Sequence, residues 1–128
     1  MSTNYIPAGY NCIMPYLIVK GTIGFLDFTQ KVFGAEVKMK MMQGEDIILH
    51  GEINIGGSVI MFSESNDRFG VQNAGMFIYV PDADVAYKLA LENGATSLMP
   101  MSDQSYDRTG GILDPYGNTW WVTTPAKG

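Results

Sequence analysis

The sequence has little of what several classes of protein need. Its 128 residues include one cysteine (Cys12), one histidine (His50) and eight Lys or Arg against 13 Asp or Glu, which gives a net charge of −5. One cysteine excludes an intramolecular disulfide and is typical of the reducing cytoplasm. The few basic residues are scattered, whereas nucleic acids and anionic membranes both require clustered positive charge. We therefore expect a cytoplasmic protein that binds neither nucleic acid nor membrane.

Long hydrophobic runs are also missing. The apolar stretch at 12–19 is interrupted by Pro15, and the first nineteen residues contain no Lys or Arg, which fits neither a membrane span nor a signal peptide. The chain is nevertheless 46% hydrophobic and 12% aromatic, enough to form the core of one domain of this length. Within that domain we expect Cys12 to be a small hydrophobic residue on a strand, not a nucleophile.

Hydrophobic periodicity predicts the same series of elements twice. Each series is a strand, a helix and three strands, at 12–19, 22–33, 36–42, 47–55 and 58–63, and again at 75–80, 82–93, 96–101, 108–113 and 119–124. Glycines that end the two helices and glycines in the last turn of each half recur at the same offset, which indicates an internal repeat. The sequence therefore predicts an α+β domain of two modules, at about 12–63 and 75–124, with a polar linker at about 64–74.

The hairpin of the first module carries the chain's ionisable pair. With a two-residue turn at 56–57, His50 and Glu52 share one face with Met61 and Ser63, because opposed residues of a hairpin point to the same side. This mixed face has two interpretations, a solvent-exposed surface or the lining of a binding site. The pair itself could act in acid–base chemistry or ligand orientation, or could be two polar groups that satisfy each other at a sheet edge.

Three segments resemble a known superfamily. The sequences FLDFTQKVFGAE at 25–36, HGEINIGGSVIM at 50–61, and DRTGG with DPYGNTW at 107–111 and 114–120 are similar to motifs of the glyoxalase/bleomycin-resistance/dioxygenase (vicinal oxygen chelate) proteins, in particular the PhnB-like branch. The resemblance implies two tandem βαβββ modules that form a cupped mixed sheet with the helices outside, a cavity inside the cup, and a homodimer.

The resemblance also implies where metal-using members of the superfamily hold their ion. Counting along the modules places these positions at Met14, Gly75, Met61 and Trp121, and none of them offers a nitrogen or a carboxylate oxygen to a first-row metal. A register shift of one residue gives no better ligands. With one histidine the chain cannot supply a two-histidine, one-carboxylate triad. We therefore predict no metal site at the usual positions and no cofactor, with a divalent metal possible only elsewhere.

The cavity implied by the resemblance has a predicted lining. We expect the ionisable pair His50 and Glu52 to lie there with five further residues: Met14, Tyr16, Met61, Ser63 and Trp121. Arg108 could receive a carboxylate or phosphate of a ligand, or could form a structural ion pair.

Two functions of different class follow. The first is a metal-independent binding protein that sequesters a small, partly aromatic or apolar molecule, such as a drug or metabolite. The second is an isomerase or lyase that uses His50 and Glu52 on a small oxygenated substrate. The apolar residues at the ligand positions favour the first.

Overall fold

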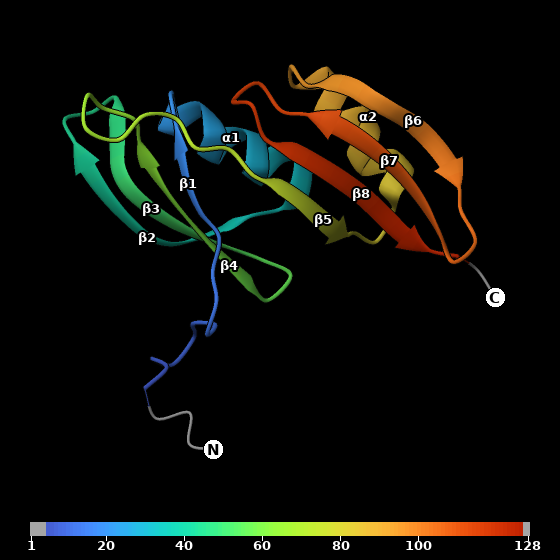
Figure 1. Cartoon of the computed structure of the whole chain (residues 1–128), viewed down its shortest axis with the longest axis horizontal. Coiled ribbons are helices and arrows are strands. Elements are labelled where there is room, and N and C mark those ends of the chain that lie inside the picture. The colour runs from blue at the N-terminus through green and yellow to red at the C-terminus, as the bar shows by residue number, and fades with distance from the viewer. Residues whose placement is uncertain (1–4, 127–128) are drawn as a thin grey trace.

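The computed structural model describes residues 5–126, which form two βαβββ modules (Figure 1). The elements of the first module are β1 (Tyr16–Val19), α1 (Thr22–Phe33), β2 (Glu36–Gln43), β3 (Ile47–Ile55) and β4 (Ser58–Glu64). Those of the second are β5 (Gly75–Tyr79), α2 (Ala83–Glu92), β6 (Thr96–Asp103), β7 (Asp107–Leu113) and β8 (Thr119–Pro125). The predicted order of elements and the internal repeat are therefore confirmed.

Each module builds one four-stranded mixed sheet. The strand orders are β1-β4-β3-β2 and β5-β8-β7-β6, and in each sheet the first pair is parallel while the others are antiparallel. The two sheets lie side by side and do not close into one (Figure 1). The predicted α+β class, with two tandem βαβββ modules and mixed sheets, is confirmed.

The two modules share one hydrophobic core. The helices α1 and α2 contact each other, and the core runs continuously from Phe25 and Phe62 in the first module to Trp120 in the second. The ring of Phe33, at the end of α1, lies 4.5 Å from the ring of Trp120. Each fully buried side chain of this size contributes roughly 1.5–3 kcal/mol, so this core holds the modules together.

The start of α1 is fixed by a residue that sequence reasoning assigned to the linker. The carboxylate of Glu64, at the end of β4, accepts hydrogen bonds from the backbone N–H of Gly21 (2.8 Å) and of Thr22 (3.0 Å). These N–H groups have no partner inside the helix, and a negative charge is favoured there. Helix α2 begins more simply, because the Asp82 side chain accepts from the N–H of Val85. Glu64 therefore ties the helix to the sheet.

The predicted hairpin register is confirmed residue by residue. Ile53 pairs with Ile60 on the face toward the helices, and Glu52 pairs with Met61 on the opposite face. We call the side turned away from the helices the open face of each sheet. A register shift between β2 and β3 at Leu49 lets Ile48 turn into the core while His50 stays on the open face.

The strand expected at 12–19 is shorter than predicted, and the placement of Cys12 on a strand is wrong. Strand β1 begins at Tyr16, and Cys12 is exposed in an irregular segment. The reason is Pro15, which has no N–H to donate to a sheet; only its carbonyl is used, accepting from the N–H of Met61 at 2.9 Å. Residues 10–15, called the strap below, instead run beside the start of β4, where Asn11 Oδ1 accepts from the N–H of Val59. Among residues 5–126 no helix has the length and apolarity to cross a membrane.

Candidate functional site

Four polar side chains form a hydrogen-bonded row on the open face of the first sheet. His50 Nε2 lies 2.9 Å from Glu52 Oε2, and His50 Nδ1 lies 3.2 Å from the hydroxyl of Tyr16. On the other side, the hydroxyl of Tyr10 donates to Glu52 Oε1 at 2.5 Å. The strands place three of the four, because Tyr16 and Glu52 both lie opposite Met61 in the sheet. Tyr10, His50, Glu52 and Tyr16 are called the His50 cluster below.

The charge in this cluster is centred on Glu52, whose surface is only 5% exposed. The hydrogen bond from Tyr10 is the main cause that lowers the pKa of Glu52; burial opposes it, while His50 and Lys38 lower the pKa further. The same contact raises the pKa of the Tyr10 phenol, so Tyr10 keeps its proton. An anionic Glu52 favours a proton on His50 Nε2, which leaves Nδ1 of a neutral ring free to accept from Tyr16. The cluster can thus accept or pass a proton, or orient a ligand hydroxyl.

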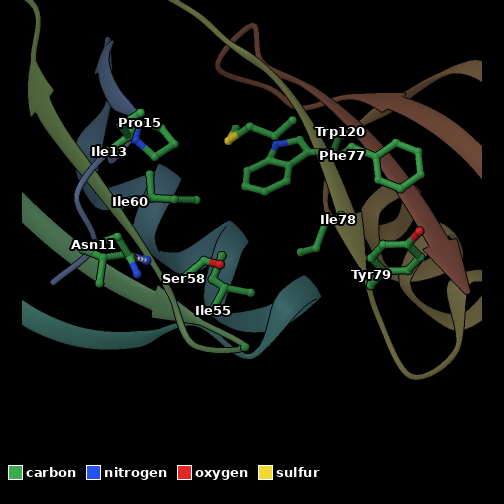
Figure 2. A pocket seen from close by; sticks show the side chains of 13 residues that line it. Asn11, Ile13, Pro15, Ile55, Ser58, Ile60, Phe77, Ile78, Tyr79 and Trp120 are labelled. Atoms are coloured by element: carbon green, nitrogen blue, oxygen red, sulfur yellow. Dashed lines mark hydrogen bonds between the residues drawn. The ribbon is translucent and has the colours of Figure 1, made fainter. Parts of the chain in front are cut away.

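A groove of about 650 Å³ separates the two modules beside the strap. Figure 2 shows side chains of the strap and the β3–β4 hairpin on one side, and side chains of β5 with Trp120 on the other. The apolar members of its lining are Ile13, Pro15, Ile55, Val59, Ile60, Met76, Phe77, Ile78 and Trp120. Three polar side chains, those of Asn11, Ser58 and Tyr79, also reach it. The groove has the size and mixed lining of small-molecule sites, which hold a few polar groups in an apolar wall.

The tryptophan of the groove is held in place by a buried carboxylate. The indole N–H of Trp120 donates to Asp114 Oδ2 at 2.8 Å, and Asp114 is 3% exposed. The other oxygen of Asp114 accepts from the backbone N–H groups of Tyr116 (2.8 Å) and Asn118 (2.9 Å). Sequence reasoning interpreted 114–118 as a turn, which it is, but missed that the turn fixes Trp120. The signal was present, since an aspartate opens the turn six residues before a tryptophan.

The open face of the second sheet carries a shallower cavity of about 430 Å³. Its wall includes Trp121, Phe77 and Met99. Trp121 covers Gly111, because a Cβ at that glycine would come within 2.4 Å of the indole ring. This glycine therefore gives Trp121 a flat surface on which to lie.

Arg108 is engaged by acidic side chains of its own chain. Its guanidinium donates to both oxygens of Asp84, at 2.7 and 2.9 Å, and to Asp103 at 3.2 Å. The hydrogen bonds that Arg108 donates to Asp84 and Asp103 are the main cause that raises the pKa of Arg108. Its planar fork is thus already paired, at the edge of a separate cavity of about 540 Å³.

The structure brings some of the predicted site residues together and separates others. Five of them share the open face of the first sheet: Tyr16, His50, Glu52, Met61 and Ser63. Met14 is half-buried in the strap, Trp121 lies on the second sheet, and Arg108 pairs with acidic residues elsewhere. Sequence reasoning missed Tyr10, because the irregular segment around it shows no periodicity. Within residues 5–126, no three His, Cys, Asp or Glu side chains are grouped closely enough to hold a metal ion.

Comparison with known proteins finds relatives in sequence and neighbours in structure. No protein-family model matches the chain. An uncharacterised protein of Mycobacterium bovis is 27% identical over 140 residues, which cover 99% of this chain and 89% of that protein. Among solved structures, TioX from Micromonospora sp. ML1 has a TM-score of 0.75 at 19% identity, over 91% of this chain and 99% of TioX.

Two further solved structures show which proteins share this fold. A glyoxalase/bleomycin resistance protein/dioxygenase family enzyme from Burkholderia phytofirmans PsJN has a TM-score of 0.68 at 16% identity, over 88% of this chain and 97% of that chain. TnmS3, an antibiotic binding protein from Streptomyces sp. CB03234, has a TM-score of 0.66 at 13% identity, over 91% of this chain and 98% of that chain. The chain therefore has the fold of the glyoxalase/bleomycin-resistance/dioxygenase proteins, as its three sequence motifs predicted.

Proposed function

We propose that the protein is a cytoplasmic small-molecule-binding protein whose ligand, partly aromatic and largely apolar, lies in the groove between the modules. The groove itself carries this proposal: about 650 Å³ lined by apolar side chains and an anchored tryptophan, within the range of known ligand sites. An aromatic ligand could pack against the exposed rings of Phe77 and Tyr79 in the groove, a contact that typically contributes about 0.5–1.5 kcal/mol beyond the area buried. A protein of the same fold, TnmS3, is described as antibiotic binding, which supports a ligand of this class.

We also propose that binding requires no metal. The family resemblance, counted along the two modules, places the usual metal positions at Met14, Gly75, Met61 and Trp121. Two thioethers, a hydrogen and an indole are unsuited to zinc, nickel or iron. Stoichiometric content of one of these metals in the purified protein would contradict the proposal.

The His50 cluster favours a second function, that of an isomerase or lyase acting on a small oxygenated substrate. The observation behind it is the direct contact of His50 with the buried carboxylate of Glu52, an arrangement that can move a proton. A His50→Ala variant that keeps full ligand affinity but loses turnover would support catalysis. A His50→Ala variant that loses neither affinity nor turnover would count against catalysis and leave binding as the only proposed function.

A homodimer is part of the proposal. Large apolar side chains are exposed on both open faces, with Tyr16 and Met41 about half exposed on the first sheet and Phe77 and Tyr79 more so on the second. Exposed apolar surface of this kind commonly marks an interface. Sedimentation velocity at micromolar concentration should show a dimer, and a monomer alone would refute this part.

The binding function is tested by filling the groove. Ser58 lies at the rim of the groove and is exposed, so Ser58→Trp should reduce the affinity for a groove ligand at least tenfold without disturbing the core. Ser105→Trp, at an exposed loop residue outside the groove, is the matched control. Ligands would come from a thermal-shift screen of aromatic antibiotics and glutathione adducts, and affinities from titration calorimetry. Equal binding by wild type and Ser58→Trp would show that the groove is not the site.

A further inference from the structure

The His50 cluster contains one member that does not belong to the sheet. Tyr16, His50 and Glu52 lie on strands, whereas Tyr10 lies at the start of the strap. Its backbone N–H bonds only locally, to the carbonyl of Pro7 at 3.2 Å. The hydrogen bonds that tie the strap to β4 come later in the chain, from Asn11 and Pro15. Tyr10 could therefore leave the cluster without breaking any strand pairing.

The place that Tyr10 occupies on the open face, called the recess below, offers several contacts that suit a phenol. Glu52 Oε1 accepts the hydroxyl at 2.5 Å, and Lys38 Nζ lies 4.5 Å from the centre of the aromatic ring. A cation over the face of a ring attracts it electrostatically. Met39 lies opposite Glu52 and Met41 opposite His50 in the sheet, which places two thioethers on the same face, and thioethers pack well against aromatic rings.

The hydrogen-bond acceptor at this position, the carboxylate of Glu52, is buried and held in place by the protein. Glu52 is 5% exposed, and one of its oxygens is already taken by His50. The other oxygen needs a donor, because a buried acceptor without one lowers affinity roughly tenfold or more for any occupant that cannot supply it. An anionic occupant would be repelled by the carboxylate. The occupant that fits is neutral and aromatic and carries a hydroxyl.

We infer that Tyr10 occupies a subsite for a phenolic ring, and that the ligand carries a free phenol that displaces Tyr10 from Glu52. This inference rests on the proposed binding function and specifies the class of its ligand. The strap connects the two places, because its residues Asn11, Ile13 and Pro15 line the groove while Tyr10 fills the recess. A phenol that displaces Tyr10 thus releases one end of a segment that forms a wall of the groove.

The chain offers a site-specific reporter for this subsite. His50 is its only histidine, so the imidazole signals in an NMR spectrum report on the cluster alone. The probe is 4-ethylphenol, and 4-ethylanisole is its matched control because it keeps the ring but cannot donate to Glu52. Wild type, Tyr10→Ala and Tyr10→Ala/Glu52→Gln would each be titrated with both compounds.

Tyr10→Ala should bind 4-ethylphenol at least tenfold more tightly than wild type, since a recess that Tyr10 fills more than nine-tenths of the time is open to the probe for the remainder only. It should bind 4-ethylanisole at least tenfold more weakly than 4-ethylphenol, and the added Glu52→Gln change should remove that preference. Equal affinity of wild type and Tyr10→Ala for 4-ethylphenol, or equal affinity for the two probes, would overturn the inference.

Two further measurements keep the test decisive. If Tyr10→Ala does not fold, Tyr10→Phe takes its place, because it removes the hydroxyl and keeps the ring. Tyr10→Phe should still bind 4-ethylphenol more tightly than wild type does. An affinity no higher than that of wild type would overturn the inference. The Ser58→Trp assay is read separately. A groove ligand whose binding is blocked by Ser58→Trp, in a protein that shows no phenol effect at His50, would refute the phenol subsite alone. A phenol effect at His50 with no groove ligand would refute the groove function alone.

Discussion

Removing the carboxylate of Asp114 should strongly destabilise the protein, because within residues 5–126 that side chain is the acceptor on which several buried donors depend. Asp114→Ala would leave four hydrogen bonds unmade, from the backbone N–H of Tyr116, the backbone and side-chain N–H of Asn118, and the indole of Trp120. Asn118 and Trp120 are 0% and 1% exposed, so water cannot replace the lost acceptor there. Each buried donor left without a partner costs about 1–3 kcal/mol.

Three of the four donors belong to these two buried residues, so the free energy of unfolding should fall by about 3–9 kcal/mol. That is a large part of the roughly 5–15 kcal/mol that a domain of this kind has. Urea denaturation followed by circular dichroism measures the change, and the tryptophan fluorescence, to which Trp120 and Trp121 both contribute, should shift as the surroundings of Trp120 loosen. Asp67→Ala, at an exposed loop aspartate, is the control and should leave the midpoint unchanged. A loss below about 1.5 kcal/mol for Asp114→Ala would refute the reasoning.

Other changes test the cluster and the hairpin. Because the pKa of Glu52 is lowered, its contribution to stability is present above pH 4.5 and is lost as the pH falls through the lower folded value. The stability difference between wild type and Glu52→Gln, measured by urea titrations between pH 3 and 7, should therefore be largest at neutral pH and shrink toward pH 3. A difference that stays constant with pH would contradict this. Gly51→Ala would place a Cβ 2.4 Å from the buried ring of Phe62 and should lower the free energy of unfolding by about 1–3 kcal/mol. Gly70→Ala, which has open space around it, is the control and should lower it far less. Equal urea midpoints for the two variants would show that the ring of Phe62 can move aside. His50→Ala should leave the affinity of a groove ligand that has no phenol within twofold of wild type in calorimetry, because His50 does not line the groove. A larger loss would show that such ligands also contact the His50 cluster.

Much of the fold could be predicted because the signals that specify it are local. Period-two alternation and the Gly56-Gly57 turn fix which side chains of the hairpin share a face, and the structure pairs Glu52 with Met61 as expected. The contact between His50 and Glu52 follows from their spacing of two residues on one strand, and it forms at 2.9 Å. The core position of Trp120 follows in the same way from alternation along β8.

The features that were not predicted depend on contacts between distant parts of the chain. Glu64 caps α1 from 42 residues away, and Tyr10 reaches Glu52 across the same separation. No periodicity in the residues around Glu64 or Tyr10 marks such a contact. The first strand was predicted too long because its apolar composition outweighed Pro15, although a proline without an N–H is a sufficient reason for the strand to begin later.

The strap shows why side-chain periodicity alone cannot specify a site of this kind. Alternation predicts a face with Glu52 and His50, but whether that face is open to ligand depends on what crosses it, and here the crossing segment brings its own phenol to Glu52. The same segment supplies Ile13 and Pro15 to the groove on its other side. The two candidate sites are therefore two sides of one short irregular stretch, and any change that frees Tyr10 acts on the wall of the groove as well. Affinity in the groove and occupancy at Glu52 should consequently vary together across variants of the strap, whereas two independent sites would vary separately.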